Sequence, residues 1–416
     1  MSAILWKGQS LLGFEKESRP ADHIFVLKTL IDTYKKSGKK LYTCFVDFQK
    51  AFDSVWRVGL FYKLLKYGMS CDLVNIIKNM YGRTSICLKM NQSVTPQFRT
   101  YCGVRQGCIL SPKLFNLFIN DIPALFDDTC GPALLGEKRI SCLMYADDLV
   151  LLSDSQIGLQ NCLNKLHDYT IKWGLKLNLK KTKVLVFQNG GRRTPGAFHF
   201  GHRQVDREKT YKYLGTIITD TGNFKSNEAN LKRKGLRASY IVMKNIGIHA
   251  KPSTAISIFE KVVEPILTYN CEISQAYLPK KWDYNKFKTN LLNIGGELNK
   301  VVLSFLRQIL GVHKKTTNVA ILAETGKLPI SFRVLTSIYK YWVRSFTSDS
   351  EMVREAMKCN NLNYQGGGQS WIKMVHYIVR LAGTQDQQPT DDIKANNKLI
   401  MGLKKRLKQV LPVCPE

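Results

Sequence analysis

Short apolar segments alternate with longer segments of helical periodicity over the first half of the chain. Residues 41–48, 142–152 and 181–187 each contain a short apolar run, which predicts strands that are buried on both faces. Between the last two, residues 157–173 repeat apolar side chains every three or four positions, as an amphipathic helix does. The order of strands and helices predicts an α+β fold in which helices back an antiparallel sheet.

The second half of the chain has a different pattern. From about residue 224 it becomes mainly helical and basic, as in residues 230–247 (NLKRKGLRASYIVMKNIG). Residues 364–371 (YQGGGQSW) predict a flexible break, and residues 383–392 (GTQDQQPTDD) predict a polar linker. No apolar run approaches the roughly 18 residues that span a bilayer, so we expect no membrane segment.

Two adjacent carboxylates, Asp147 and Asp148, interrupt the second apolar segment. Like charges ~4 Å apart repel by about 4 kcal/mol at an effective dielectric near 20, and a buried carboxylate is costly unless it is paired or bound to a metal. A second isolated acid, Asp47, follows the first apolar run. If the two strands are neighbours, Asp47 and Asp147 meet, and their hard oxygen ligands favour Mg²⁺ or Mn²⁺. Asp148 can equally serve as a cap or turn residue.

The charge of the chain indicates its partner. Lysine and arginine number 62 against 32 aspartate and glutamate, and the net charge of +30 is spread along the chain. Such an excess favours a polyanionic partner, and nucleic acid is preferred over a membrane surface because no basic amphipathic helix has a strongly apolar opposite face. The eleven cysteines form no CxxC pair, so we expect reduced thiols in an intracellular protein, in the nucleus or the cytoplasm.

Several motifs resemble those of reverse transcriptases. YADD at 145–148 and FVDFQKAFD at 45–53 are similar to the catalytic motifs of that family, and the KAFD ending resembles the non-LTR retrotransposon lineage (long interspersed elements, jockey/RTE-like). Further stretches resemble the family's later motifs in the same order: GVRQGCILSPKLFNLFIND (103–121), GLKLNLKKTKVLVF (174–187), YKYLG (211–215) and the post-polymerase segment 307–330. The ordered set is a more specific signal than any one motif.

The resemblance implies an RNA-directed DNA polymerase that works by two-metal-ion nucleotidyl transfer, with an RNA template, a DNA primer and dNTPs as partners. It implies that the catalytic and metal-binding residues are Asp47, Asp147 and Asp148. It implies that the nucleotide site contains Phe52, Arg105, Gln106, Gly107 and Lys183. Phe52 matches the steric-gate position, whose ring excludes a 2′-hydroxyl. Lys180 and Lys181 compete with Lys183 for the cation at the leaving pyrophosphate, and the sequence does not choose among them.

The resemblance also implies a primer grip and an architecture. The primer grip would contain Tyr211, Tyr213, Leu214 and Gly215. The fold would be a right-hand polymerase with an antiparallel palm sheet, partial fingers and a helical thumb. Its expected divisions are partial fingers (1–40), palm with finger insertions (41–210), primer grip, thumb and post-polymerase helices (211–345), and a basic C-terminal extension with flexible linkers (346–416).

Three other interpretations are weighed against this one. Relatives carry more finger residues ahead of position 13, so we expect a truncated N-terminus and impaired polymerisation. The main alternative is a catalytically weak or inactive nucleic-acid-binding protein derived from such an element. An RNA-dependent RNA polymerase is disfavoured by Phe52 and by Ala146 before the paired acids, and a group II intron maturase by the KAFD and RQGCILSP forms.

Overall fold

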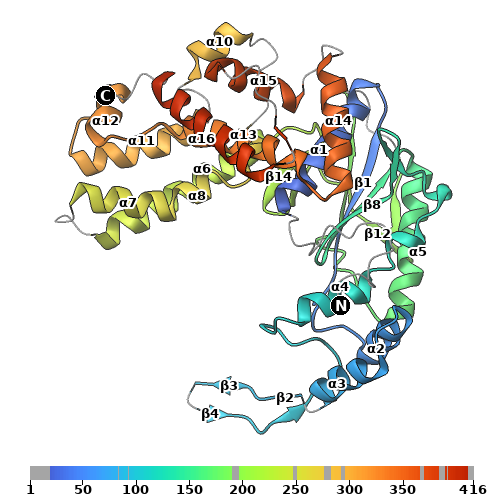
Figure 1. Cartoon of the computed structure of the whole chain (residues 1–416). Helices are drawn as coiled ribbons and strands as arrows, with labels where there is room; N and C mark the ends of the chain where they lie inside the picture. Colours follow the sequence, from blue (N-terminus) through green and yellow to red (C-terminus); the bar gives the residue numbers. More distant parts are fainter. Residues whose placement is uncertain are drawn as a thin grey trace. The chain divides into compact units, whose positions relative to one another are not determined.

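The computed structural model of the chain contains two compact units (Figure 1). It describes residues 19–82, 84–91, 93–189, 196–246, 251–275, 283–291, 296–365, 370–383, 389–390 and 392–410. The first unit is built on residues 37–211, and the second combines residues 20–36 with residues 212–416. Both helices and strands are present, which confirms the predicted α+β class.

A four-stranded antiparallel sheet forms the centre of the first unit. Its order is β10 (Lys183–Phe187), β1 (Leu41–Asp47), β9 (Asp148–Ser153) and β8 (Cys142–Tyr145). The two central strands, β1 and β9, are buried at every position except their ends beside the acids. Their nearly continuous apolar sequence therefore reflects burial on both faces, as predicted.

Helices and short hairpins surround this sheet. The helices are α2 (Arg57–Lys66), α3 (Cys71–Gly82), α4 (Ser111–Ile119) and α5 (Gln156–Trp173), with two short 3₁₀ helices, Pro123–Leu125 and Asp128–Cys130. The hairpins of this unit pair β2 (Ser85–Ile86) with β5 (Phe98–Arg99), β3 (Lys89–Met90) with β4 (Ser93–Val94), β6 (Ala133–Leu135) with β7 (Lys138–Ile140), and β11 (Phe198–Phe200) with β12 (Arg203–Val205). A further hairpin, β13 (Thr210–Tyr213) with β14 (Thr216–Thr219), begins at the end of the first unit and lies mainly in the second. The β2–β5 segment, residues 84–100, forms an arm that extends away from α3 (Figure 1).

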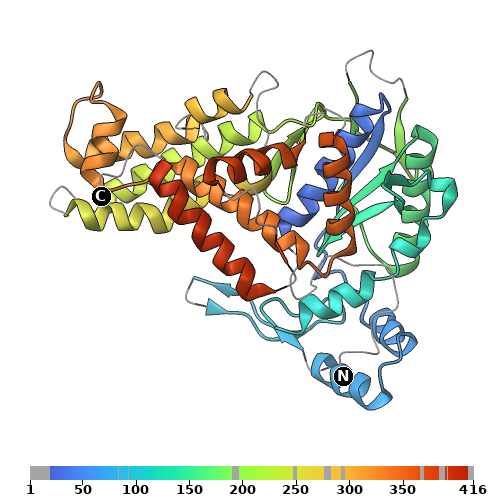
Figure 2. The ribbon, with the colours of Figure 1, turned by 45° about the horizontal axis from the view of Figure 1, so that its top comes forward.

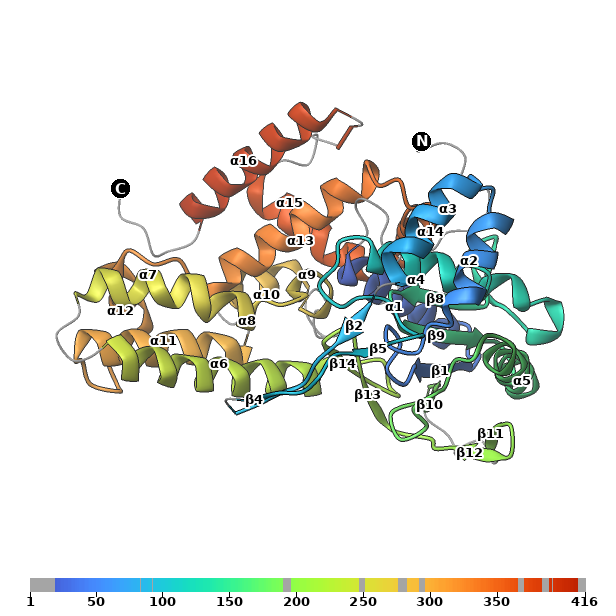
Figure 3. The ribbon, with the colours of Figure 1, turned by 90° about the horizontal axis from the view of Figure 1, so that it is seen from below.

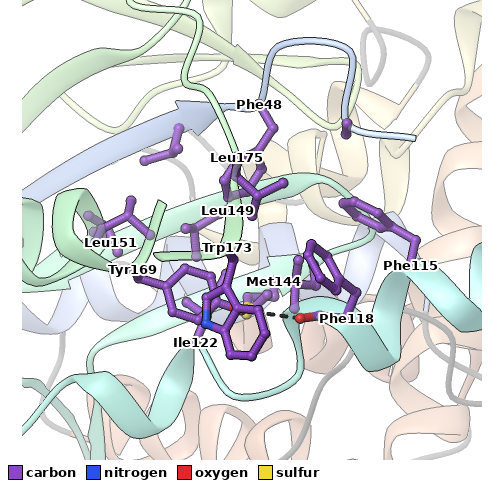
Figure 4. Packing of buried hydrophobic residues seen from close by; sticks show 14 of the residues in the cluster. Phe48, Phe115, Phe118, Ile122, Met144, Leu149, Leu151, Tyr169, Trp173 and Leu175 are labelled. Atoms are coloured by element: carbon purple, nitrogen blue, oxygen red, sulfur yellow. Dashed lines mark hydrogen bonds between the residues drawn. The ribbon is translucent and has the colours of Figure 1, made fainter. Parts of the chain in front are cut away.

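The core of the first unit lies between the sheet and the helices α4 and α5. Figure 4 shows Phe118, Tyr169 and Trp173 packed together beside Met144. α5 follows the predicted amphipathic pattern: Ser155 caps its first turn by accepting a bond from the Gly158 amide. Each large side chain that is buried here contributes roughly 1.5–3 kcal/mol.

The second unit is almost wholly helical. Its helices are α1 (Pro20–Lys36), α6 (Lys225–Ile246), α7 (Pro252–Val262), α8 (Glu264–Leu267), α9 (Cys271–Ser274), α10 (Tyr284–Thr289), α11 (Gly296–Leu310), α12 (Asn318–Thr325), α13 (Ile330–Phe346), α14 (Glu351–Gln365), α15 (Trp371–Ala382) and α16 (Ile393–Val410). Figure 3 shows α6, α7 and α11 side by side, and these three helices share one apolar cluster. None of the helices in the described part of the chain is long and apolar enough to cross a bilayer.

The helix nearest the N-terminus, α1, belongs to the second unit. It lies along α14 (Figure 2), where Asn360 donates a hydrogen bond of 2.7 Å to Thr29. Arg344 of α13 pairs with the buried Asp22 at 3.1 Å. The expected fingers, palm and thumb boundaries stay a prediction. Of the predicted linkers, residues 366–369, 384–388 and 391 lie outside the described residues.

A buried lysine joins α2 to the core. The Lys63 ammonium bonds to the Phe118 carbonyl at 2.6 Å, the Asp121 carboxylate at 2.6 Å and the Tyr169 hydroxyl at 2.8 Å. It also lies 3.8 Å from the centre of the Trp173 ring. Burial lowers the pKa of Lys63 to about 8, although the bond to Asp121 acts in the opposite direction. The ammonium is therefore compensated on every side.

We predict that Lys63→Met lowers the free energy of unfolding by about 2 kcal/mol, because three acceptors lose their common donor. Urea denaturation of the full chain measures this. Lys66→Met, on the exposed side of the same helix, is the matched control and should change stability by less than about 0.5 kcal/mol. Equal stability of the two variants would contradict a structural role for Lys63.

Candidate active site

Two of the predicted acids face each other at one end of the sheet. Asp47 is the last residue of β1 and Asp148 the first of β9, and the two are direct partners in the antiparallel register. The strands that carry Asp47 and the acid pair are therefore neighbours, as the sequence analysis required. Asp147 precedes Asp148 in the turn between β8 and β9. One end of the sheet thus brings Asp47 together with an acid pair that lies a hundred residues later in the sequence.

The turn that carries Asp147 is tight. Tyr145 and Asp148 are paired, so only Ala146 and Asp147 connect the two strands. Ala146 has a φ of +53°, in the left-handed region that costs a residue with a Cβ of order 1 kcal/mol or more. The turn holds the two adjacent acids at the end of the hairpin and prevents them from entering the strand core.

The carboxylates influence each other electrostatically. The pKa of Asp148 is raised to about 6, first by burial, then by the negative charges of Asp147 and Asp47, while Lys181 acts in the opposite direction. A carboxyl group with a pKa this high is held in its charged form at a cost. A cation at this point would remove that cost.

The donor set fits a hard divalent ion. Among the residues that the structure describes, no three His, Cys, Asp or Glu side chains form a preformed metal cage. Mg²⁺ is usually held by one or two carboxylates, with waters and substrate phosphates completing its shell. Carboxylates whose charge is only partly compensated, here by Lys181, match that mode of binding better than a closed structural site.

A turn at residues 178–182 fixes the end of β1. The Asp47 amide donates to the Thr182 hydroxyl at 3.2 Å, and the Asp47 carbonyl accepts from the Asn178 amide at 2.8 Å. The Lys181 ammonium lies 3.7 Å from the Asp47 carboxylate. The Lys183 ammonium, in contrast, pairs with Asp206 at 2.6 Å. Of the three competing lysines, Lys181 is the one that forms an ion pair with a candidate metal ligand.

The predicted nucleotide residues surround the turn that follows β1. The Phe52 ring stacks on Phe115 of α4, with the ring centres 4.9 Å apart and the planes at 25°. The Gln106 amide donates to the Asp53 carboxylate at 2.8 Å. Gly107 has a φ of +78°, which favours glycine at this position. Phe52, Gln106 and Gly107 therefore belong to two adjacent segments, residues 50–55 and 103–107.

Arg105 has protein partners in this structure. Its guanidinium donates to the Met80 carbonyl at 2.6 Å and to the Thr84 hydroxyl at 3.2 Å. The group remains exposed, so these bonds compete with water and with any ligand. Whether it contacts template or triphosphate stays a prediction.

The first residue of the predicted primer grip lies close to the acids. The Tyr211 ring stacks on Phe45 of β1, with the ring centres 4.4 Å apart and the planes at 18°. Burial raises the pKa of the Tyr211 hydroxyl, and the charges of Asp148 and Asp47 raise it further. Tyr211 therefore forms part of the same neighbourhood as the carboxylates.

The remaining residues of the predicted primer grip belong to the second unit. Leu214 and Gly215, with φ of +44° and +79°, connect β13 to β14, and Tyr213 is buried. The Tyr269 hydroxyl donates to the Leu214 carbonyl at 3.2 Å, and a Cβ on Gly215 would lie only 2.8 Å from the Tyr269 ring. The positive φ and the short distance to the Tyr269 ring therefore both favour glycine at position 215.

Three polar residues at these segments were not assigned a role from the sequence: Asp53, Arg57 and Thr182. Asp53 and Thr182 lie inside the quoted motifs, but their partners are a side chain and a backbone amide from distant segments. The helical spacing of the sequence could have identified Arg57 as a buried cation, because it occupies the same face of α2 as the buried Leu60 and Leu64.

We predict that Asp148→Asn stabilises the metal-free protein by about 1–2 kcal/mol at pH 8, after allowance for solvent screening. Because the pKa of Asp148 is higher in the native state than in the unfolded state, protonation of Asp148 stabilises the native wild-type protein. This contribution is fully present below the unfolded pKa near 4 and is lost as the pH rises through about 6. The two proteins should therefore be equally stable at pH values below about 4. Urea titrations across this range, with the exposed Asp168→Asn as control, measure the difference. A variant no more stable than the wild type at pH 8 contradicts the assigned cost of a charged, partly buried Asp148.

Comparison with known proteins identifies the family. Residues 7–218 match the family model described as reverse transcriptase (RNA-dependent DNA polymerase), which is 212 of the 416 residues. The Pol polyprotein from the type-2 retrotransposable element R2DM of Drosophila melanogaster is 28% identical over 236 residues, which are 55% of this chain and 22% of that protein. The RNA-directed DNA polymerase from the mobile element jockey of Drosophila funebris is 30% identical over 196 residues, which are 46% of this chain and 21% of that protein.

The chain spans about a fifth of the length of these curated relatives. Among solved structures, a telomerase from Candida tropicalis in complex with a fragment of telomeric RNA superposes with a TM-score of 0.38 at 13% identity, over 85% of this chain and 54% of that chain. The family match spans more than half of the sequence and includes Asp47, Phe52, Gln106, Asp147, Asp148 and Tyr211. The chain therefore belongs to the reverse transcriptase family, with polyproteins of non-LTR retrotransposons among its relatives.

Proposed function

We propose that this chain carries out RNA-directed DNA synthesis, in which it extends a DNA primer on an RNA template with dNTPs. The observation that carries the proposal is the pairing of Asp47 with Asp148 across two central strands, next to Asp147 at the hairpin turn. These acids lie inside the segment that matches the family. The burial of Asp148 and its repulsion by Asp147 and Asp47 support a site that becomes more stable when divalent cations bind.

Asp47 and Asp147 would hold the divalent ions, with Asp148 beside them, and we assign Mg²⁺ or Mn²⁺ because hard carboxylate oxygens suit both. When bound, such ions stabilise the charge on the reacting phosphoryl group and make the primer hydroxyl a better nucleophile. The protein's own contribution is to hold Asp47 still, and the bonds from Thr182 and Asn178 to its backbone support that role.

Lys181 is the lysine that we assign to the leaving pyrophosphate. Its ammonium lies within ion-pair distance of Asp47 while 68% of its side chain remains exposed, so it can turn toward a ligand. Lys183 is less suited, because Asp206 already neutralises it and only 16% of its side chain is exposed. A cation near the leaving group stabilises negative charge that develops there, or donates a proton to it.

Phe52 is the residue that we assign to the selection of deoxynucleotides. A ring that excludes a 2′-hydroxyl must not move aside, and the stacking of Phe52 on Phe115 supports such rigidity. The bond between Gln106 and Asp53 keeps the neighbouring polar side chains in place. Together they support a nucleotide site formed by residues 50–55 and 103–107.

The second unit offers cations for a nucleic-acid backbone. On α6, Arg233, Arg237 and Lys244 recur at a spacing that places them on one exposed face, and Tyr240 lies between them with 69% of its surface exposed. The opposite face of the helix packs in the core of the unit. Such a row of cations suits contacts to phosphates without base recognition.

We predict that the purified chain extends a DNA primer on an RNA template in the presence of Mg²⁺ and dNTPs, and that Asp147→Asn reduces the rate by at least about a thousandfold, because oriented metal and electrostatic stabilisation is lost. The exposed Asp168→Asn, on α5, is the control and should retain full activity. Salt-sensitive RNA binding without extension that depends on Asp147 would favour the nucleic-acid-binding alternative.

We predict that Lys181→Met lowers the rate of nucleotide addition about 10²-fold, the size expected for the loss of one general acid or charged donor. Lys180→Met, one residue earlier and also exposed, should have less than about a threefold effect, because a solvated lysine contributes little. Single-turnover extension separates this effect from primer binding. A larger loss for Lys180→Met or for Lys183→Met would reassign the role to that lysine.

A further inference from the structure

One arginine of the first unit is buried and uses every donor that it has. Arg57, the first residue of α2, is 8% exposed. Its Nε donates to the Gly103 carbonyl at 2.9 Å, and its Nη1 donates to the carbonyls of Tyr81 at 3.1 Å and Thr100 at 2.5 Å. Its Nη2 donates to the Thr100 hydroxyl at 3.1 Å and to the Cys102 carbonyl at 3.0 Å. A guanidinium has five N–H groups, so all of them are satisfied.

The acceptors come from both ends of the β2–β5 arm. Tyr81 lies in the last turn of α3, just before the arm, Thr100 is the last residue of the arm, and Cys102 follows it. Gly103 begins the 103–107 segment of the candidate nucleotide site. No carboxylate forms an ion pair with Arg57 among the described residues, so its partners are mainly backbone carbonyls. Its role is therefore to join backbone segments.

The 103–107 segment is attached in turn to the segment that carries Phe52. The Gly103 amide donates to the Val55 carbonyl at 2.8 Å, and the Val104 amide donates to the Phe52 carbonyl at 2.8 Å. Gly103 has a φ of +82°, and a Cβ there would lie 2.8 Å from the Asp53 carbonyl oxygen. The two segments are in direct backbone contact. Arg57 lies two residues after the 50–55 segment in the sequence.

The guanidinium groups of Arg57 and Arg105 both contact the Tyr81 ring. The Tyr81 ring is 5.2 Å from the Arg57 guanidinium and 5.7 Å from that of Arg105, and its hydroxyl is 3.1 Å from the Ser111 hydroxyl. The position of Arg105 therefore depends on the same residue, Tyr81, whose carbonyl Arg57 binds.

We propose that Arg57 is a positioning residue for nucleotide selection: it fixes both ends of the arm and the 103–107 segment against the Phe52 turn. This inference rests on the proposed polymerase function. On the proposed function, the Phe52 ring decides whether a sugar with a 2′-hydroxyl fits. The bond from the Val104 amide to the Phe52 carbonyl passes a shift of the 103–107 segment on to that residue. A displacement of about 1 Å at such a site can change rates about 10²-fold. Lysine cannot replace Arg57, because an ammonium has three donors and no planar fork.

The test uses the full chain with Arg57→Lys, which keeps the charge and the aliphatic stem. We expect the KM for dNTPs to rise about tenfold and the preference for dNTPs over ribonucleotides to fall by a similar factor, while the Kd for primer–template stays within about twofold. Amide hydrogen exchange at Gly103 and Val104 should become faster, because their segment loses its anchor. Arg139→Lys, an exposed arginine in the same unit, is the control and should change none of these.

Thr100→Val is a milder variant that removes one acceptor of Arg57 and serves if Arg57→Lys does not fold. It should raise the KM for dNTPs about threefold, in line with the loss of one hydrogen bond. If the folded variant keeps the wild-type KM and nucleotide preference, the inference is overturned even when hydrogen exchange is faster, since Arg57 is then only structural. If primer–template binding weakens as much as nucleotide binding, it is overturned as well. If neither the wild-type chain nor the Arg139→Lys control synthesises DNA, the proposed function itself is overturned. That outcome is distinct from a failure of the Arg57 inference, in which both of these proteins remain active.

Discussion

Repulsion among Asp47, Asp147 and Asp148 is the constraint around which the first unit is organised. The pKa of Asp148 is raised to about 6, first because the carboxyl group is partly buried and then because Asp147 and Asp47 are negatively charged. A less constrained chain would separate the acids, but the register of β1 with β9 and the two-residue turn after Tyr145 hold them together. The buried apolar strands on either side supply the stability that this arrangement costs, at roughly 1.5–3 kcal/mol for each large side chain. Under the proposed function, divalent cations would remove this cost when they bind, so the arrangement would serve catalysis at the expense of stability.

The surroundings of Asp47 are rigid on two sides. On one side, the 178–182 turn bonds to both the amide and the carbonyl of Asp47. On the other side, the Phe52 turn is bonded to the 103–107 segment, which Arg57 anchors. Separate contacts therefore fix the two regions: one set holds the backbone of Asp47, and the other holds the backbone of the Phe52 turn. Both sets rely on backbone hydrogen bonds, which tolerate less displacement than contacts between long side chains.

The sequence predicts the strands correctly because short, continuous apolar runs are typical of strands buried on both faces, and the strands that carry Asp47 and the acid pair are neighbours, as the metal-site hypothesis requires. It does not predict that Asp47 faces Asp148, since the register of β1 with β9 arises between strands about a hundred residues apart and no local pattern contains it. It also does not choose between Lys181 and Lys183, which differ only in the direction of their side chains and in the presence of Asp206. The place of α1 in the second unit depends on contacts with residues more than 300 positions away, such as the bond from Asn360 to Thr29, which no local pattern contains.

The helical periodicity of α2 places two cations, Arg57 and Lys63, on its buried face. Lys63 and Arg57 lie on the same face as Leu60 and Leu64, where a charge is expected only if it has dedicated partners. Lys63 finds a carboxylate, a hydroxyl and an aromatic ring, and so it stabilises the core. Arg57 finds backbone carbonyls that flank the arm, and a residue of this kind controls where segments lie more than how stable they are. A charged residue on an apolar helical face is therefore worth examining as a positioning residue when its helix directly follows a candidate active-site turn.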